Sequence, residues 1–257
     1  ALGLAATQSA GLMAAQYEAM SKRMHHGFAS RAGLTAGWLA AHGYTGIKRV
    51  YEREYGGFLS VFGEGHSPDA SQVCEALGER WETDRIVVKP YAAMGGLHAP
   101  IDAVLALRAS RPLRPEEIAV VDVWVGEAVF HHGGFAVSRP LTAIGAQMSL
   151  AYALAVAVID GAASLSQFNP ERIERDDVWE LIPKIRMHKE AQEPDALGRR
   201  LRARVRLTFS DGSKQELERP LRHSGDIPND EITTKFLSLA DHVISPTRRD
   251  HIAETVL

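Results

Sequence analysis

The sequence has a single cysteine, Cys74, among its 257 residues. One thiol cannot close an intrachain disulfide, and it cannot supply the several thiolates that an iron–sulfur cluster or a zinc–thiolate site needs. The scarcity of cysteine is typical of a reducing compartment, so we expect a cytoplasmic protein.

The chain also lacks an excess of charge of either sign. Its 29 Lys and Arg residues and 32 Asp and Glu residues give a net charge of −3. A protein that binds nucleic acid normally presents a basic surface, so we expect no nucleic-acid partner. Apolar residues make up 45% and charged residues 24% of the chain. This composition excludes a mainly disordered chain and predicts a globular protein with a sizeable core.

Long hydrophobic runs are almost absent. Only the alanine-rich stretch 142–161 approaches the roughly 18 apolar residues of a membrane span, and Gln147, Ser149 and Tyr152 interrupt it. We therefore expect a core helix there, and no membrane partner. The chain opens within an apolar helical pattern and has no basic segment before it. This favours part of a longer protein over a signal peptide.

Several common catalytic and metal-binding motifs are absent. No G-x-G-x-x-G follows a strand, and the sequence has no G-x-S-x-G, no H-E-x-x-H and no P-loop. His131 and His132 follow a predicted strand, but adjacent side chains on an extended segment point to opposite faces. No third ligand stands at a suitable spacing, so we expect no metal site.

Hydrophobic periodicity predicts helices first, then strands mixed with helices, then helices again. Helices are expected over 1–20, from Ser21 to a stop at Gly43, and over 99–110, 142–161 and 229–257. Residues 201–209 alternate with period two and lead into a hairpin turn with Asp-Gly at its centre. Further strands are expected over 118–125 and 185–188. The change of pattern near residue 85 predicts a domain boundary.

Lys22 and His25 form the first candidate site. They are three residues apart at the beginning of a predicted helix, so both side chains can face one side. A lysine and a histidine together make a cationic, proton-transferring pair that suits a polyanionic acid. The alternative interpretation is an ordinary solvated helix start.

The second candidate site lies between Lys89 and Asp102. Gly95 and Gly96 precede His98 and a helix start, an arrangement that lets backbone and imidazole approach a ligand closely. Tyr152 in the alanine-rich helix is a third candidate. The alternatives are an ordinary loop histidine and a buried tyrosine with a satisfied hydroxyl.

Five segments, in this order, resemble the MmgE/PrpD family, which includes 2-methylcitrate dehydratase, cis-aconitate decarboxylase and iminodisuccinate epimerase. Each segment is similar to one stretch of the family's pattern, and together they run along most of the chain. They are Ser21–Ala29 (K-x-x-H-x-G-x-A), Tyr44–Gly46 with Glu54–Phe58, Lys89–Ala103 (K-x-Y…H…DA), Ala146–Gly161, and Gly225–Asn229 with Lys235-Phe236.

The resemblance implies an α+β fold in which a mainly helical domain carries an inserted, smaller α+β domain. Residues 1–84 and 223–257 would belong to the helical domain and residues 85–222 to the α+β domain. The site would lie in the cleft between the domains, usually within a homodimer, and the reaction would need no metal and no cofactor. The family's upstream helices have no counterpart here, so the chain resembles the C-terminal portion of a family member.

Carried over to this sequence, the resemblance implies that Lys22, His25, His98 and Tyr152 are catalytic and that Lys89 binds a substrate carboxylate. One departure is the segment Ala93–Gly96, where many relatives carry a small polar residue or a cysteine. The family's chemistry is proton transfer next to a carboxylate, so the expected activity is dehydration or decarboxylation of a di- or tricarboxylate such as 2-methylcitrate or cis-aconitate.

Two alternatives stay open at this point. The first is an epimerase or isomerase that acts on a related dicarboxylate. The second is a truncated, non-catalytic relative that serves only as a helical dimerisation partner.

Overall fold

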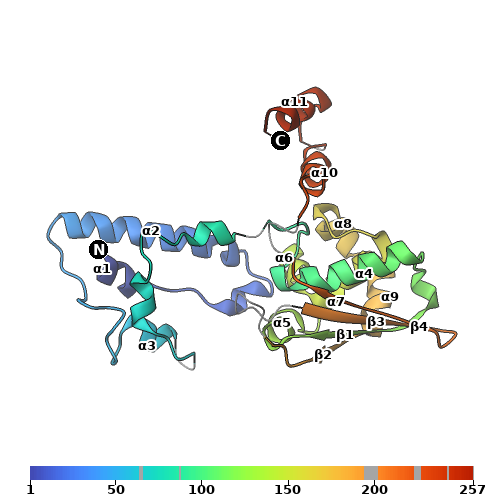
Figure 1. The fold of residues 1–257 in the computed structure, drawn as a ribbon, viewed down its shortest axis with the longest axis horizontal. Helices are drawn as coiled ribbons and strands as arrows, with labels where there is room; N and C mark the ends of the chain where they lie inside the picture. Colours follow the sequence, from blue (N-terminus) through green and yellow to red (C-terminus); the bar gives the residue numbers. More distant parts are fainter. Residues whose placement is uncertain (64–65, 87, 194–201, 223–226, 242, 257) are drawn as a thin grey trace. The chain divides into compact units, whose positions relative to one another are not determined.

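A computed structural model describes residues 1–63, 66–86, 88–193, 202–222, 227–241 and 243–256 (Figure 1). The described chain divides into two compact units, Ala1–Arg85 and Ile86–Leu257. Helices and a mixed sheet make this an α+β fold, as the sequence predicted. No helix within the described ranges is both long enough and apolar enough to cross a lipid bilayer.

The first unit is helical, and its main element is α2 (Ser21–Ala41). This confirms the predicted helix that stops before Gly43, where φ is +82°. The other elements are short: α1 (Leu2–Thr7), α3 (Phe58–Phe62) and the 3₁₀ segments η1 (Met13–Gln16), η2 (Ala70–Cys74) and η3 (Glu82–Arg85).

The prediction of a continuous helix over residues 1–20 was wrong. The helical conformation ends at Thr7 and resumes as a 3₁₀ turn at Met13. Between them Gly11 has a φ of +128°, which no helical residue adopts. Close packing of small residues does occur in α1, because a Cβ on Gly3 would lie 2.2 Å from the carbonyl oxygen of Ile47.

The second unit is built on a four-stranded sheet in the order β2-β1-β3-β4. Strand β1 pairs in parallel with β2, while β1–β3 and β3–β4 are antiparallel. The predicted strands are confirmed, and the hairpin turn falls at the predicted Asp-Gly, with Gly212 at a φ of +84°. The strands are β1 (Ile118–Val125), β2 (Ile185–Lys189), β3 (Arg202–Phe209) and β4 (Lys214–Pro220).

One face of the sheet is buried by helices. Alternate residues of β1 and β3, such as Val121, Val123 and Val205, are fully buried in the core. Helix α4 (His98–Ser110) packs on β3, β4 and α7 (Leu150–Asp160), and Figure 1 shows α4 running across the sheet. The chain after Lys89 enters the core at the beginning of α4, where Leu97, Ala99 and Ile101 are buried.

The alanine-rich stretch forms two helices instead of the single helix predicted over 142–161. Helix α6 (Ala143–Met148) ends at Ser149, whose backbone is extended, with a ψ of 122°. The Ser149 hydroxyl then accepts a hydrogen bond from the Tyr152 amide, 3.2 Å away, and caps α7. Serine in an apolar pattern therefore marks a helix boundary here.

Short helices complete the second unit. After β1 comes α5 (Glu127–Gly133), and α8 (Pro170–Ile173) and α9 (Asp176–Leu181) follow α7. At the end of the chain α10 (Asn229–Ala240) packs against α11 (Pro246–Val256). The 3₁₀ segments are η4 (Gly95–Leu97), η5 (Pro115–Glu117), η6 (Leu165–Phe168) and η7 (Ile182–Lys184).

Candidate functional site

The segment between Lys89 and His98 is held in place by its own backbone. The Ala92 amide donates to the Ala163 carbonyl at 3.0 Å, and the Met94 amide donates to the Gln147 carbonyl at 2.9 Å. Gly96 lets the segment pack on α5, because a Cβ there would lie 2.7 Å from the Val129 side chain. The segment is thus fixed before it enters α4 at His98.

His98 is buried, with only 3% of its surface exposed. Its Nε2 lies 3.4 Å from the Ala93 carbonyl oxygen, and the Tyr91 ring meets the imidazole edge-on at 5.3 Å. Because a carbonyl oxygen only accepts, Nε2 carries the proton in this contact and Nδ1 keeps its lone pair.

Burial lowers the pKa of His98 to about 4, since the charged imidazolium is poorly solvated in the core. The Ala93 carbonyl opposes this effect, while the positive charges of Lys89, Arg222 and Lys235 lower the pKa further. His98 is therefore a neutral imidazole near neutral pH. It can donate or accept a hydrogen bond, but it holds no extra proton to transfer.

A polar network fixes the other side of Tyr91. Its hydroxyl donates to Asp102 of α4, and burial together with this contact raises the pKa of the phenol. Arg222 donates to both oxygens of Asp102, at 3.0 Å each, and to both oxygens of Glu231, at 2.7 and 2.9 Å. The network joins α4, the chain after β4, and α10.

Two lysines add positive charge beside this network. The Nζ of Lys89 lies 3.5 Å from the Ala93 carbonyl, which His98 also contacts. The Nζ of Lys235, on α10, donates to the Lys89 carbonyl. Lys89, Lys235 and Arg222 thus place three positive charges near His98, and of these Arg222 binds the carboxylates of Asp102 and Glu231. This cationic corner is suited to hold a substrate carboxylate.

Sequence reasoning named Lys89 and His98 as candidates in this region, and it assigned no role to the four residues of the network: Tyr91, Asp102, Arg222 and Glu231. It also assigned no role to Lys235. Tyr91, Asp102 and Lys235 stand inside segments that carry the family resemblance. Their place in the pattern could have marked them as candidates.

Tyr152 is fully buried in α7. Within the described residues, the hydrogen bond and the ring contact of its side chain are with Gln167 and Phe168, not with residues of the cationic corner. Its hydroxyl donates to the Gln167 carbonyl at 2.6 Å, and its ring packs on Phe168. Burial raises the pKa of its phenol. Among the described residues, its polar contacts do not include His98. A catalytic role for Tyr152 stays a prediction.

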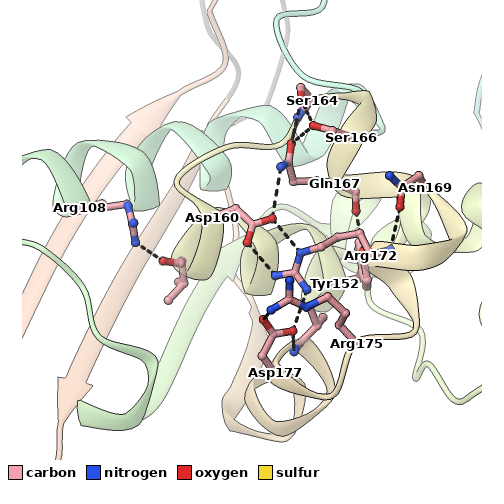
Figure 2. A network of polar contacts seen from close by, with 12 residues as sticks. Arg108, Tyr152, Asp160, Ser164, Ser166, Gln167, Asn169, Arg172, Arg175 and Asp177 are labelled. Carbon is pink, nitrogen blue, oxygen red and sulfur yellow. Dashed lines mark hydrogen bonds and ion pairs between the residues drawn. The ribbon is translucent and has the colours of Figure 1, made fainter. Parts of the chain in front are cut away.

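A second polar network surrounds Tyr152 (Figure 2). The Arg172 guanidinium binds both oxygens of Asp160, at 2.7 and 2.9 Å, and reaches Asp177 at 2.7 Å. Gln167 also donates to Asp160 at 3.2 Å. Burial alone would raise the pKa of Asp160, but Arg172 and Gln167 outweigh it and lower the pKa. The network fixes the end of α7. Three residues further on lies Ala163, whose carbonyl accepts the hydrogen bond from the Ala92 amide.

Lys22 and His25 lie on α2 in the first unit. Both side chains are half-buried, whereas Arg23, Met24 and His26 between and after them are exposed. The pair therefore shares one side of the helix, as the spacing predicted. The His25 ring lies beside Gly11, where a Cβ would be 3.6 Å away. That this pair shares a cleft with Lys89 and His98 of the second unit stays a prediction.

His131 and His132 lie on α5, so the expectation of an extended segment was wrong. His131 contacts Glu127 at 3.5 Å, one helical turn away. Within the part of the chain that the structure describes, no three His, Cys, Asp or Glu side chains gather in a way that could hold a metal ion.

Comparison with known proteins extends these observations. A family model described as the MmgE/PrpD N-terminal domain matches residues 1–71, and one described as the MmgE/PrpD C-terminal domain matches residues 91–257. These matches include the segments that carry Lys22, His25, His98 and Tyr152.

Two fungal relatives match along the whole chain, and a mouse relative matches along most of it. The cis-aconitate decarboxylase-like protein oryM of Aspergillus oryzae is 42% identical over 270 residues, which cover 100% of this chain and 56% of the relative. The cis-aconitate decarboxylase of Aspergillus terreus is 40% identical over 272 residues, covering 100% of this chain and 55% of the relative. The mouse cis-aconitate decarboxylase is 24% identical over 214 residues, 81% of this chain and 42% of the relative. The chain spans about half the length of the curated relatives it matches.

Proposed function

The chain belongs to the MmgE/PrpD family, and from this membership we propose that it is part of a lyase that decarboxylates an unsaturated tricarboxylate such as cis-aconitate. The observation that carries the proposal is 40–42% identity, over the whole chain, to a cis-aconitate decarboxylase and a decarboxylase-like protein. The cationic corner around His98 supports it, because the substrate class carries several carboxylates.

A site for decarboxylation must stabilise the negative charge that develops on the substrate, and it must supply a proton. When the carbon–carbon bond to the leaving carboxylate breaks, its electron pair stays on the substrate carbon and must be stabilised until that carbon takes up a proton. In the proposal Lys89 and Lys22 bind the carboxylates that remain and screen this charge. One proton then enters from an acid for each CO2 that leaves.

The low pKa of His98 decides which of the two histidines, His25 or His98, is proposed as the proton donor. A neutral His98 with a pKa of about 4 is a poor proton donor near neutral pH. We therefore assign the proton to His25 and a hydrogen-bonding role to His98. Tyr152 is proposed to assist as a donor, for which its hydroxyl would exchange the Gln167 carbonyl for the substrate.

The remaining expectations belong to the same proposal. The enzyme would be a cytoplasmic homodimer and would need neither a metal ion nor an organic cofactor. Dehydration of 2-methylcitrate and epimerisation of a dicarboxylate are the other reactions of this type. The names of the relatives favour decarboxylation.

The test is an assay of the full-length gene product that contains this sequence. Cis-aconitate, citrate and 2-methylcitrate are followed by NMR, with CO2 release measured in parallel. We expect CO2 release from cis-aconitate that persists after treatment with EDTA. A folded protein that dehydrates 2-methylcitrate but releases no CO2 would replace the decarboxylase by a dehydratase. A folded protein that turns over none of the acids would favour the non-catalytic alternative.

A further inference from the structure

A pocket of about 430 Å³ lies in the second unit between α10, the turn after α7 and the chain before α4. Its size is within the range of small-molecule sites. Its walls are mainly apolar, and the side chains that matter here are Tyr91, Leu105, Ala163, Leu165, Leu239 and Lys235. His98 and Tyr152 do not line it.

Lys235 gives this apolar pocket a positive charge. Its Nζ donates to the Lys89 carbonyl, and an ammonium group has three N–H donors. Among the described residues Lys235 has no carboxylate partner. Glu231, one turn earlier on α10, also lines the pocket, but Arg222 binds both of its oxygens. The Lys235 ammonium therefore keeps donors for an anion.

We propose that this pocket binds a short-chain monocarboxylic acid, with its carboxylate on Lys235 and its alkyl chain against Tyr91, Leu105 and Ala163. The apolar walls set the class of ligand. A second carboxylate would enter the pocket without a partner, which costs binding free energy, whereas an alkyl chain gains it. Lys235 also belongs to the cationic corner, but this ligand is of a different class from the proposed substrate, and its binding is measured whether or not the protein is a decarboxylase.

The probe is hexanoate, and its binding to the intact protein is measured by isothermal titration calorimetry. Hexanamide has the same length without the charge, and butanoate has a shorter chain. We expect hexanoate to bind at least tenfold more tightly than hexanamide, and each added methylene between butanoate and hexanoate to tighten binding about fourfold.

Two variants and one control test the assignment. Lys235→Met is expected to remove the preference for hexanoate over hexanamide, whereas Lys214→Met, at an exposed position of β4 outside the pocket, is expected to retain it. Ser238→Phe places a ring into the pocket from an exposed position on α10 and should abolish binding in a folded protein. Equal affinity for hexanoate and hexanamide would overturn the proposal. Hexanoate binding that survives both Lys235→Met and Ser238→Phe would do so as well.

Discussion

Arg222 donates two hydrogen bonds to the carboxylate of Asp102, although 120 positions separate the two residues in the chain. The Arg222 side chain is 26% exposed and that of Asp102 is 12% exposed, so the pair is largely shielded from water. Because Asp102 also accepts from Tyr91, the pair helps to hold the ring that flanks His98. Arg222 thereby acts on the candidate site through Tyr91.

Replacement of Arg222 by Gln is expected to destabilise the fold. The change leaves the carboxylates of Asp102 and Glu231 without their common cation, which we expect to cost about 2–3 kcal/mol in the free energy of unfolding. The control is Arg114→Gln, which removes an exposed ion pair with Glu117 and should cost less than about 1 kcal/mol. Urea denaturation of both variants measures the difference. Equal costs would contradict a special role for Arg222.

The lowered pKa of buried His98 makes the stability of the fold depend on pH. Its pKa is about 4 in the folded protein, compared with an ordinary value of 6.5. Between these values the unfolded chain binds more protons, so stability is lost as the pH falls from 6.5 towards 4. We expect this residue to account for about 2–3 kcal/mol of the loss between pH 7 and pH 4.5.

The measurement is urea denaturation of the native protein and of His98→Gln across this pH range. The variant lacks the titrating imidazole, so its stability should depend less on pH. His251→Gln, at an exposed position on α11, serves as control and should behave like the native protein. If His98→Gln and the native protein lose the same stability between pH 7 and pH 4.5, His98 is not buried as described.

The strands could be predicted from the sequence because their pattern is local. Ile118–Val125 and Arg202–Phe209 alternate between a buried and a more exposed face, because helices pack on one face of the sheet. A stretch of eight residues is enough to show this alternation with period two, which is typical of a half-buried strand. The family resemblance likewise located Lys89 and His98 through short motifs.

The networks could not be predicted in the same way. The contact between Arg222 and Asp102 depends on how β4 and α4 meet, and no local pattern encodes a pairing across 120 positions. The break at Ser149 was missed for a different reason. The apolar pattern continues across it, and only the extended backbone shows that this serine begins a second helix.

Tyr152→Phe tests whether its hydroxyl has a structural or a catalytic role. The change leaves the Gln167 carbonyl without its buried donor, so we expect a loss of about 1–2 kcal/mol in stability. Tyr55→Phe, at a fully exposed position, should cost almost nothing. The proposed donor role adds the expectation that kcat falls at least tenfold in the folded variant. An unchanged kcat would make Tyr152 a purely structural residue.

The adjacent histidines of α2 offer a matched test of the proposed proton donor. His25 is half-buried on the same side of the helix as Lys22, whereas His26 is exposed. We expect His25→Ala to lower the kcat for CO2 release about 10²-fold or more, in the range of general acid catalysis. Lys22→Ala should raise KM, because it removes a cation that is proposed to bind a substrate carboxylate. His26→Ala removes the same side chain one position away and should leave both constants unchanged. Steady-state kinetics of the full-length gene product, with circular dichroism to verify folding, distinguishes these outcomes. If His25→Ala and His26→Ala are equally active, the proton comes from another group and the assignment to α2 is wrong.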